Sequence, residues 1–347
     1  MDHSGDFDAT TVYLNTASMG LPPHTTRAAL TSALQEWAAG RAEPEDYDAA
    51  VRTARTVFAQ MVHVDAGQVA IGHQVAPLIG LIAAAVPDGA EVLVPEGEFT
   101  SVTFPFAAHQ ERGVRVRQAP LADLAAHVGA DTAVVAVAAV QSATGAIADL
   151  DRLEETCARY GADLVVDLTQ ATGWFDVRAG RFAATVCGAY KWLLSPRGSA
   201  FLTVRPELAE RLRPLAANWF AGEDVWESIY GLPLRLAADA RRFDVSPAWH
   251  SWVGTAASLE YLREIGPAAL QEHALGLAHV FEEAADLPPG GSAIISVRAD
   301  HTVPGVLADL GVVAAQRAGR LRLSFHVHNT AEQAHRVGRA LRGRISR

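Results

Sequence analysis

Cysteine is scarce in this chain of 347 residues, where only Cys157 and Cys187 occur. Two cysteines form neither a disulfide framework nor a four-thiolate zinc site. Basic residues are also in the minority, with 29 Lys and Arg against 39 Asp and Glu, and they form no run before the C-terminal tail. A nucleic-acid-binding surface must neutralise phosphates, so this balance argues against a nucleic-acid partner.

Long apolar runs are missing as well. The longest, around residues 75–86, falls short of the roughly 20 residues that a membrane-spanning helix needs. The first eight residues are acidic and have no apolar centre, unlike a signal peptide. We therefore expect a cytoplasmic protein with no membrane partner. Half of the residues are hydrophobic, which is enough for a large core, plausibly in two domains.

Several well-known site motifs are absent from the sequence. It contains no Gly-x-Gly-x-x-Gly fingerprint, phosphate-binding P-loop, His-Glu-x-x-His or Gly-x-Ser-x-Gly. Their absence weakens the NAD-dependent, nucleotide-hydrolysing, zinc-hydrolase and serine-hydrolase interpretations. His326 and His328 alternate on a predicted strand, but no third ligand is near them in the sequence, so we expect no metal site.

What the sequence does contain is an alternation of strand and helix patterns. Short β-branched runs are expected to form strands at residues 69–71, 91–94, 114–117, 132–140, 163–170 and 200–204. Helical patterns lie between or around them, at residues 24–39, 47–61, 75–86, 100–110, 121–127, 149–160 and 249–265. A helix running to about residue 285, strands at 293–297 and 321–325, and helices near 304–310 and after 329 follow. The alternation predicts an α/β fold with a mostly parallel sheet.

The stretch from Asp163 to Gly198 concentrates the chemistry. Asp167 falls where an apolar strand ends, at the carboxyl edge where open α/β sheets bind ligands. Lys191 stands between Tyr190 and Trp192. Each residue alone has an ordinary explanation, because an Asp often caps a turn and a Lys often lies at the surface. Alternatively, the Lys is an amine kept partly neutral by burial so that it can attack a carbonyl.

Taken together, these residues resemble a known family. Asp167-x-x-Gln170, then a small-residue strand, Tyr-Lys191-Trp-Leu and Pro196-x-Gly198 is similar to the pattern of class V aminotransferases, which are fold-type I pyridoxal phosphate (PLP) enzymes. The resemblance implies that Lys191 forms the Schiff base with PLP, that Asp167 pairs with the pyridinium nitrogen and that Gln170 lies near the phenolic oxygen. It implies a large PLP-binding α/β domain over residues 22–243, a small α+β domain from residues 1–21 and 244–347, and a homodimer.

The resemblance also suggests contacts with the cofactor's phosphate and ring. His73 and Gln74 stand at a predicted strand–helix junction where class V enzymes bind the phosphate, a role that suits free N–H groups at a helix start. The Ser-x-His that precedes the lysine in many relatives is replaced by Gly188-Ala-Tyr190, so the Tyr190 hydroxyl is a candidate phosphate contact. Phe99 is expected to stack on the ring or to pack in the core. Two serines complete this set of candidates. Ser142 stands where desulfurases often carry Asn, and Ser246 would reach the phosphate of the neighbouring subunit.

Two further residues are candidates for binding the substrate. Asn15 lies in an N-terminal segment similar to one that enters the family's active site. Arg317 resembles the family's carboxylate-binding Arg, and a guanidinium can hold both oxygens of a carboxylate. Arg322 is the alternative for that role, and a surface ion pair is the ordinary explanation for either.

The expected function is that of a PLP-dependent enzyme acting at the α-carbon of an amino acid, most simply an aminotransferase (a transferase). A carbon–sulfur β-elimination lyase or an epimerase is the alternative. Cysteine desulfurases need a nucleophilic Cys on a mobile loop soon after the carboxylate-binding Arg, and none follows Arg317. A binding or regulatory protein that keeps the fold without catalysis is the alternative from a different class. The joint presence of Asp167, Gln170 and Lys191 argues against it.

Overall fold

The fold is described from a computed structural model, which covers residues 2–347. Its centre is a seven-stranded sheet in which β8 runs antiparallel to its neighbours β2 and β7, while the other adjacent strands pair in parallel. In spatial order the strands are β2 (Val69–Gly72), β8 (Ala200–Val204), β7 (Ala184–Gly188), β6 (Asp163–Asp167), β5 (Thr132–Ala138), β3 (Glu91–Pro95) and β4 (Arg115–Ala119).

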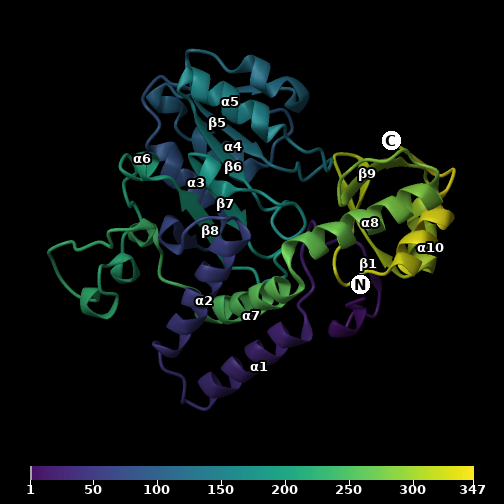
Figure 1. The fold of residues 1–347 in the computed structure, drawn as a ribbon, viewed down its shortest axis with the longest axis horizontal. Helices are drawn as coiled ribbons and strands as arrows, with labels where there is room; N and C mark the ends of the chain where they lie inside the picture. The colour runs from purple at the N-terminus through teal and green to yellow at the C-terminus, as the bar shows by residue number, and fades with distance from the viewer. Residues whose placement is uncertain (1) are drawn as a thin grey trace.

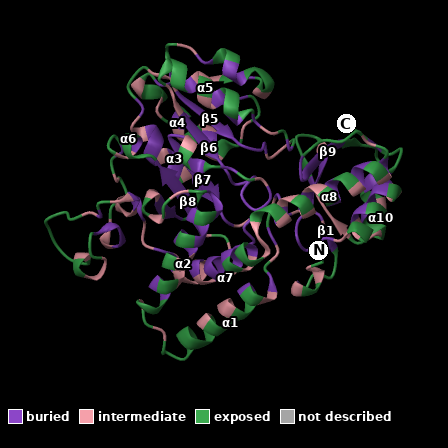
Figure 2. Cartoon of the chain, in the orientation of Figure 1, coloured by how far each residue is buried: buried purple, intermediate pink, exposed green. Residues whose placement is uncertain are grey.

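Helices cover both faces of this sheet, and alternate side chains of one strand show how. In β5, Val134 and Ala136 pack into one apolar cluster, while Val135 and Val137 belong to the other, as the two-residue period of a strand requires. The first cluster includes α3 (Val75–Ala84) and α4 (Thr100–Ala107); the second includes α2 (Asp46–Met61) and α5 (Leu150–Tyr160). The inner strands of the sheet are accordingly buried almost throughout, whereas the edge strand β4 is partly exposed (Figure 2).

A second, smaller lobe lies to one side of the large sheet (Figure 1). Its antiparallel sheet has the spatial order β11 (Ala315–Arg317), β12 (Arg320–Ser324), β9 (Ile294–Ala299) and β13 (Ile345–Ser346). Helices α8 (Pro267–Ala285), α9 (Val303–Asp309) and α10 (Ala331–Leu341) pack with it around Phe281 and Phe325. The N-terminal β1 (Val12–Tyr13) joins this lobe by pairing in parallel with β10 (Val312–Val313).

The remaining helices connect or flank the lobes. Helix α7 (Trp249–Ile265) packs against α1 (His24–Ala38) and α2 and leads directly into α8. Between β8 and α7 the chain has only α6 (Pro206–Ala209) and isolated 3-10 turns. The 3-10 helices of the described chain are Ser4–Asp6, Ala66–Gln68, Gln110–Arg112, Leu121–His127, Ala179–Arg181, Trp219–Ala221, Trp226–Ser228 and Ala240–Phe243.

The predicted fold class is confirmed, with corrections at the ends of elements. The strand expected to run to residue 170 stops at Asp167, because the Thr169 N–H donates to the Asp167 carboxylate and turns the chain. His326 and His328 do not lie on a strand as expected: β12 ends at Ser324, and the Asn329 side chain closes a turn by accepting from the His326 N–H. The division into two domains at residue 243 stays a prediction, and Met1, which it includes, lies outside the described residues.

Candidate active site

The carboxyl edge of the large sheet opens into a cavity of about 220 Å³. The ends of β5, β6 and β7, the starts of α3 and α4, and the loop after β7 all reach it. Eight predicted site residues line it: His73, Gln74, Phe99, Ser142, Asp167, Gln170, Tyr190 and Lys191. Parallel strands end at the same edge of a sheet, which is why residues more than 100 positions apart meet here.

Lys191 lies buried in the wall of this cavity, in the turn that follows β7. Burial lowers the pKa of its amine to about 8, against the opposing effect of the Asp167 carboxylate. The Lys191 Nζ lies 5.2 Å from the centre of the Phe99 ring and 5.6 Å from the Tyr190 ring. An amine with so low a pKa is partly neutral near physiological pH, which is the form that acts as a nucleophile or a base.

Asp167 ends β6 with its carboxylate buried at the same edge. Its Oδ1 accepts the Thr169 N–H at 2.8 Å. Burial raises the pKa of Asp167, and the bonds from Thr169 and the charge of Lys191 act in the other direction. Thr169 also accepts the Gly188 N–H through its hydroxyl at 2.9 Å, which joins the end of β6 to the end of β7.

Gln170 is held in one orientation by three partners. Its Oε1 accepts the indole N–H of Trp192 at 2.7 Å, and its Nε2 donates to the Ala17 carbonyl and to Ser142 Oγ, both at 2.9 Å. Because Trp192 can only donate and the carbonyl can only accept, the oxygen and nitrogen of the amide are assigned unambiguously. Both amide hydrogens are already used within the chain.

Ser142 connects Gln170 to a pair of arginines from the small lobe. Arg322 is buried, and its Nη1 donates to the Ser142 carbonyl at 2.6 Å and to Ser142 Oγ at 3.1 Å. Ser18 Oγ accepts from Arg322 Nη2 at 2.7 Å and from the exposed Arg317 at 3.2 Å. Burial lowers the pKa of Arg322 to about 10, and the charge of Arg317 adds to the effect. Its buried Nε has no partner among residues 2–347.

Other residues that line the cavity offer N–H groups and a positive charge. Gln74 is the N-cap of α3, and its side chain makes no cap hydrogen bond, so the first N–H groups of that helix stay free for an anion. Arg197 also lines this cavity and lies with its guanidinium carbon 5.0 Å from the centre of the Tyr190 ring.

Three sequence-predicted residues, Asn15, Ser246 and Arg317, are not among the residues that line the cavity, and their roles stay predictions. Asn15 has a buried Oδ1 that finds no partner in residues 2–347. Conversely, sequence reasoning missed several lining residues: Thr100, Ser101, Thr169, Arg197 and Ser199. Arg197 carried a usable signal, because it belongs to the Pro-x-Gly turn that follows Lys191, whereas the others depend on tertiary contacts.

Comparison with known proteins agrees with this geometry. Residues 13–290 match the family model "Aminotransferase class-V", and the chain belongs to that family. It is 30% identical to an uncharacterized aminotransferase, YcbU, of Bacillus subtilis over 81% of this chain and 80% of that protein. It is 29% identical to isopenicillin N epimerase of Streptomyces clavuligerus, over 76% of this chain and 72% of the relative. A cysteine desulfurase structure from Thermococcus onnurineus superposes with a TM-score of 0.83 at 19% identity, over 96% of this chain and 95% of that one.

The residues present fit the family's cofactor, PLP. A buried amine of lowered pKa and a buried carboxylate line the same cavity, as do an arginine and the start of α3, whose N-cap side chain makes no cap hydrogen bond. These groups would provide an attachment point for PLP, an anion for its ring nitrogen and cationic or N–H groups for its phosphate. No helix of the described residues is long and apolar enough to cross a membrane.

Neither cysteine is among the residues that line this cavity. Cys157 lies buried in α5 and Cys187 lies buried in β7. Burial raises the pKa of Cys157 to about 12 and also raises the pKa of Cys187. A thiol must ionise to attack a sulfur atom, and it must reach that atom. The raised pKa values favour the protonated thiols, and both cysteines are held in regular elements instead of on a loop.

Proposed function

We propose that this chain is an aminotransferase that acts at the α-carbon of an amino acid. The amine of Lys191, with its pKa lowered to about 8, lies in the same cavity wall as the buried Asp167, which supports PLP chemistry at this site. Within that chemistry, the 30% identity to the aminotransferase YcbU favours transamination. PLP, when bound, supplies an electron sink for the electrons released as a bond at the α-carbon breaks.

The two residues have different roles in this proposal. Asp167 would keep the ring nitrogen of bound PLP protonated, because an anion in a buried site stabilises a neighbouring cation. Lys191 would hold the cofactor through its amine, and the same amine, when free, would move a proton at the α-carbon of the substrate. A base suited to that role has a pKa near the working pH, which burial provides here.

The small lobe supplies the group for the substrate carboxylate. Arg322 is buried, carries positive charge next to the cavity residue Ser142 and has a free Nε donor. Arg317, the residue predicted from the sequence, is exposed but shares the hydroxyl of Ser18 with it. We propose that Arg322 makes the main contact and that Arg317 adds positive charge from the solvent side.

A single-turnover reaction tests the assignment. The holoenzyme is mixed with an accepted amino acid while the absorption spectrum and the products are followed. Stable conversion of the cofactor to its pyridoxamine form, with one equivalent of keto acid, is expected of an aminotransferase. Release of ammonia with recovery of the original spectrum would assign a lyase instead, and inversion at the α-carbon without net product would assign an epimerase.

A further inference from the structure

The turn that carries Lys191 is held from outside on both sides of the lysine. The residues before α1, 2–23, form the N-terminal lead. The carbonyl of Tyr190, just before Lys191, accepts the N–H of Gly20 in this lead at 2.9 Å. The carbonyl of Trp192, just after it, lies 2.8 Å from Nε2 of His326 in the small lobe. The peptide groups flanking the lysine are thus fixed by two segments distant in sequence.

The protonation state of His326 follows from its two contacts. Its Nδ1 accepts the N–H of Val327 at 2.6 Å, so the ring proton must be on Nε2, which donates to the Trp192 carbonyl. The ring is buried and stacks on the Trp192 indole, with centroids 5.3 Å apart and planes inclined by 25°. One side chain therefore contacts both the backbone and the side chain of the residue next to Lys191.

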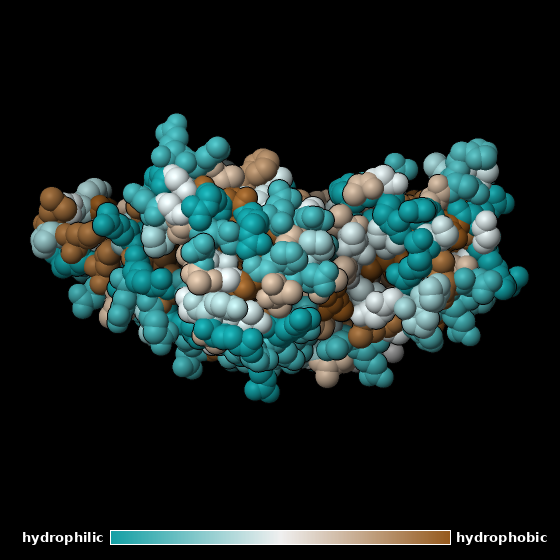
Figure 3. Space-filling model, turned by 90° about the horizontal axis from the view of Figure 1, so that it is seen from above, coloured by the Kyte–Doolittle hydropathy of each residue, from teal (hydrophilic) through white to brown (hydrophobic). Residues whose placement is uncertain are grey.

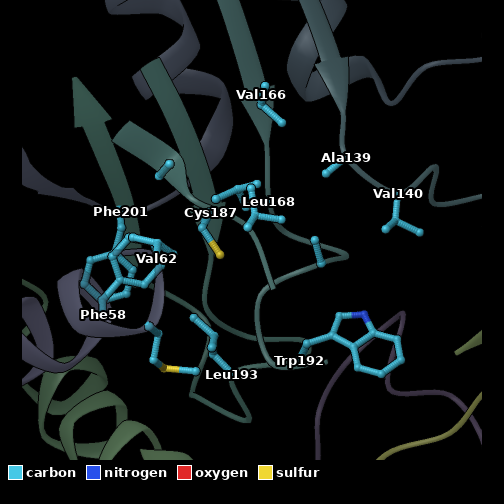
Figure 4. Packing of buried hydrophobic residues seen from close by; sticks show 14 of the residues in the cluster. Phe58, Val62, Ala139, Val140, Val166, Leu168, Cys187, Trp192, Leu193 and Phe201 are labelled. Carbon is cyan, nitrogen blue, oxygen red and sulfur yellow. The ribbon is translucent and has the colours of Figure 1, made fainter. Parts of the chain in front are cut away.

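Trp192 connects His326 to residues that line the cavity. Figure 4 shows its indole directed away from the Phe58–Phe201 pair, toward the N-terminal lead and the C-terminal segment. Its N–H holds Oε1 of Gln170, whose amide in turn donates to the cavity residue Ser142. A shift of Trp192 would move Lys191 through the backbone and Gln170 through the indole.

His326 also lies on the segment that carries the carboxylate-binding candidate. Strand β12 contains Arg322 and ends at Ser324, only two residues before His326. Ser324 itself accepts the N–H of Ala17 at 3.0 Å, which ties the same strand to the lead that contacts Gln170. The proposed carboxylate-binding residue, Arg322, and His326 thus belong to one short stretch of the small lobe.

We propose that His326 is a positioning residue, which sets the placement of Lys191 from the small lobe and couples it to the strand that carries Arg322. The inference rests on the proposed function only in taking Lys191 as the point of cofactor attachment. It does not depend on which reaction follows attachment.

Two substitutions at His326 separate its hydrogen bond from its bulk. His326→Phe keeps a planar ring for stacking on Trp192 but removes the Nε2 donor. His326→Gln loses the ring but keeps an amide N–H that can reach the position of Nε2. The matched control is His328→Phe, because His328 is equally buried and stacks on His326 at 6.1 Å, yet its Nε2 contacts the Tyr13 carbonyl instead of the lysine turn.

The measurements are made on PLP-loaded proteins. For each variant we would titrate the visible absorption band of the attached cofactor with pH, determine kcat and KM, and measure unfolding by urea. His326→Phe is expected to move the midpoint of the band's titration by at least about half a pH unit. It should lower kcat roughly tenfold or more, while KM changes by less than about threefold. His326→Gln should return the titration midpoint and kcat most of the way to their wild-type values.

The control decides between positioning and packing. His328→Phe should lose stability without moving the midpoint or kcat. The proposal is overturned if His326→Phe leaves the midpoint and kcat unchanged, or if His328→Phe moves them equally. Should His326→Phe fail to fold, His326→Leu, which also lacks the Nε2 donor, takes its place beside His326→Gln: a midpoint shifted in the Leu variant and restored in the Gln variant supports the proposal, and equal midpoints in the two overturn it. A protein that turns out to be a lyase would fail the proposed function and still give this result.

Discussion

At the scale of single residues, the site depends on one amine that burial keeps partly neutral. Replacing Lys191 with Ala should abolish the visible absorption of attached PLP and reduce turnover by a factor of at least about 10³, because both attachment and proton transfer are lost. Absorbance, borohydride reduction and mass measurement of the reduced protein check the prediction. Lys191→Arg keeps the charge beside Asp167 but cannot attach the cofactor, so it should behave like the Ala variant. A reducible adduct in either variant would place attachment elsewhere.

The choice between Arg317 and Arg322 is a second question for single residues. Arg322→Ala should raise KM for an amino acid by roughly 10- to 100-fold, since a buried charged hydrogen bond is worth about 1.5–3 kcal/mol. Arg317→Ala should have a smaller effect, because Arg317 is exposed to solvent. A substrate analogue lacking the α-carboxylate is the control: its binding should not distinguish the variants from the wild type. A larger penalty at Arg317 would return the role to the residue predicted from the sequence.

At the scale of elements, the N-terminal lead is built as closely against the lysine turn as backbone atoms permit. A Cβ added to Gly20 would lie 2.2 Å from the Lys191 carbonyl oxygen, and that oxygen belongs to backbone that cannot rotate away. Gly20→Ala should therefore cost about 1–3 kcal/mol of stability and weaken PLP binding. Urea unfolding and titration with PLP measure the two effects.

The matched control is a glycine with open surroundings. Gly276 lies within α8, and a Cβ there would meet nothing within 4 Å. Gly276→Ala should stabilise the protein by about 0.5–1 kcal/mol and leave PLP binding unchanged, because alanine restricts the unfolded chain and favours helix. If both variants bind PLP equally well, the close approach of the lead to the lysine turn does not matter for the site.

The elements also show what could be read from the sequence. Strands β5 and β6 were predictable because each has an apolar stretch with β-branched valines, residues 133–138 in β5 and 164–166 in β6. The pairing of β1 with β10 was not, since two residues carry no periodicity and their partner lies 300 positions away. In the same way, Asp167 and Lys191 were marked by local patterns, whereas Thr169 and Ser199 line the cavity through tertiary contacts.

At the scale of the whole molecule, apolar surface gathers at one end. Figure 3 shows it where the irregular chain between α6 and α7 extends from the large lobe, and the exposed large side chains there are Leu215, Ile229, Tyr230, Leu232 and Leu234. Contiguous exposed apolar surface is often an interaction site. The surface is compatible with the homodimer expected from the sequence, which stays a prediction, and sedimentation at several protein concentrations tests it.

The pH dependence of stability is a property of the whole fold, and the part that comes from His328 can be measured separately. The ring is buried between Phe7, Tyr13 and His326, and burial lowers its pKa to about 4. The unfolded histidine has a pKa of about 6.5, so between these values the unfolded chain binds a proton that the folded chain does not. The stabilisation that the buried, neutral His328 contributes to the free energy of unfolding is therefore fully present above about pH 6.5 and is lost as the pH falls toward 4.

A variant that cannot titrate at this position isolates the effect. Asp244, whose pKa burial raises to about 6, acts with the opposite sign, but it is common to both proteins and cancels in their difference. Between pH 7 and pH 5 the wild type should lose about 2 kcal/mol of unfolding free energy relative to His328→Phe. Urea denaturation of both proteins at pH 7, 6 and 5 gives this difference. A constant difference across the three values would mean that His328 takes up its proton in the folded protein as readily as in the unfolded chain.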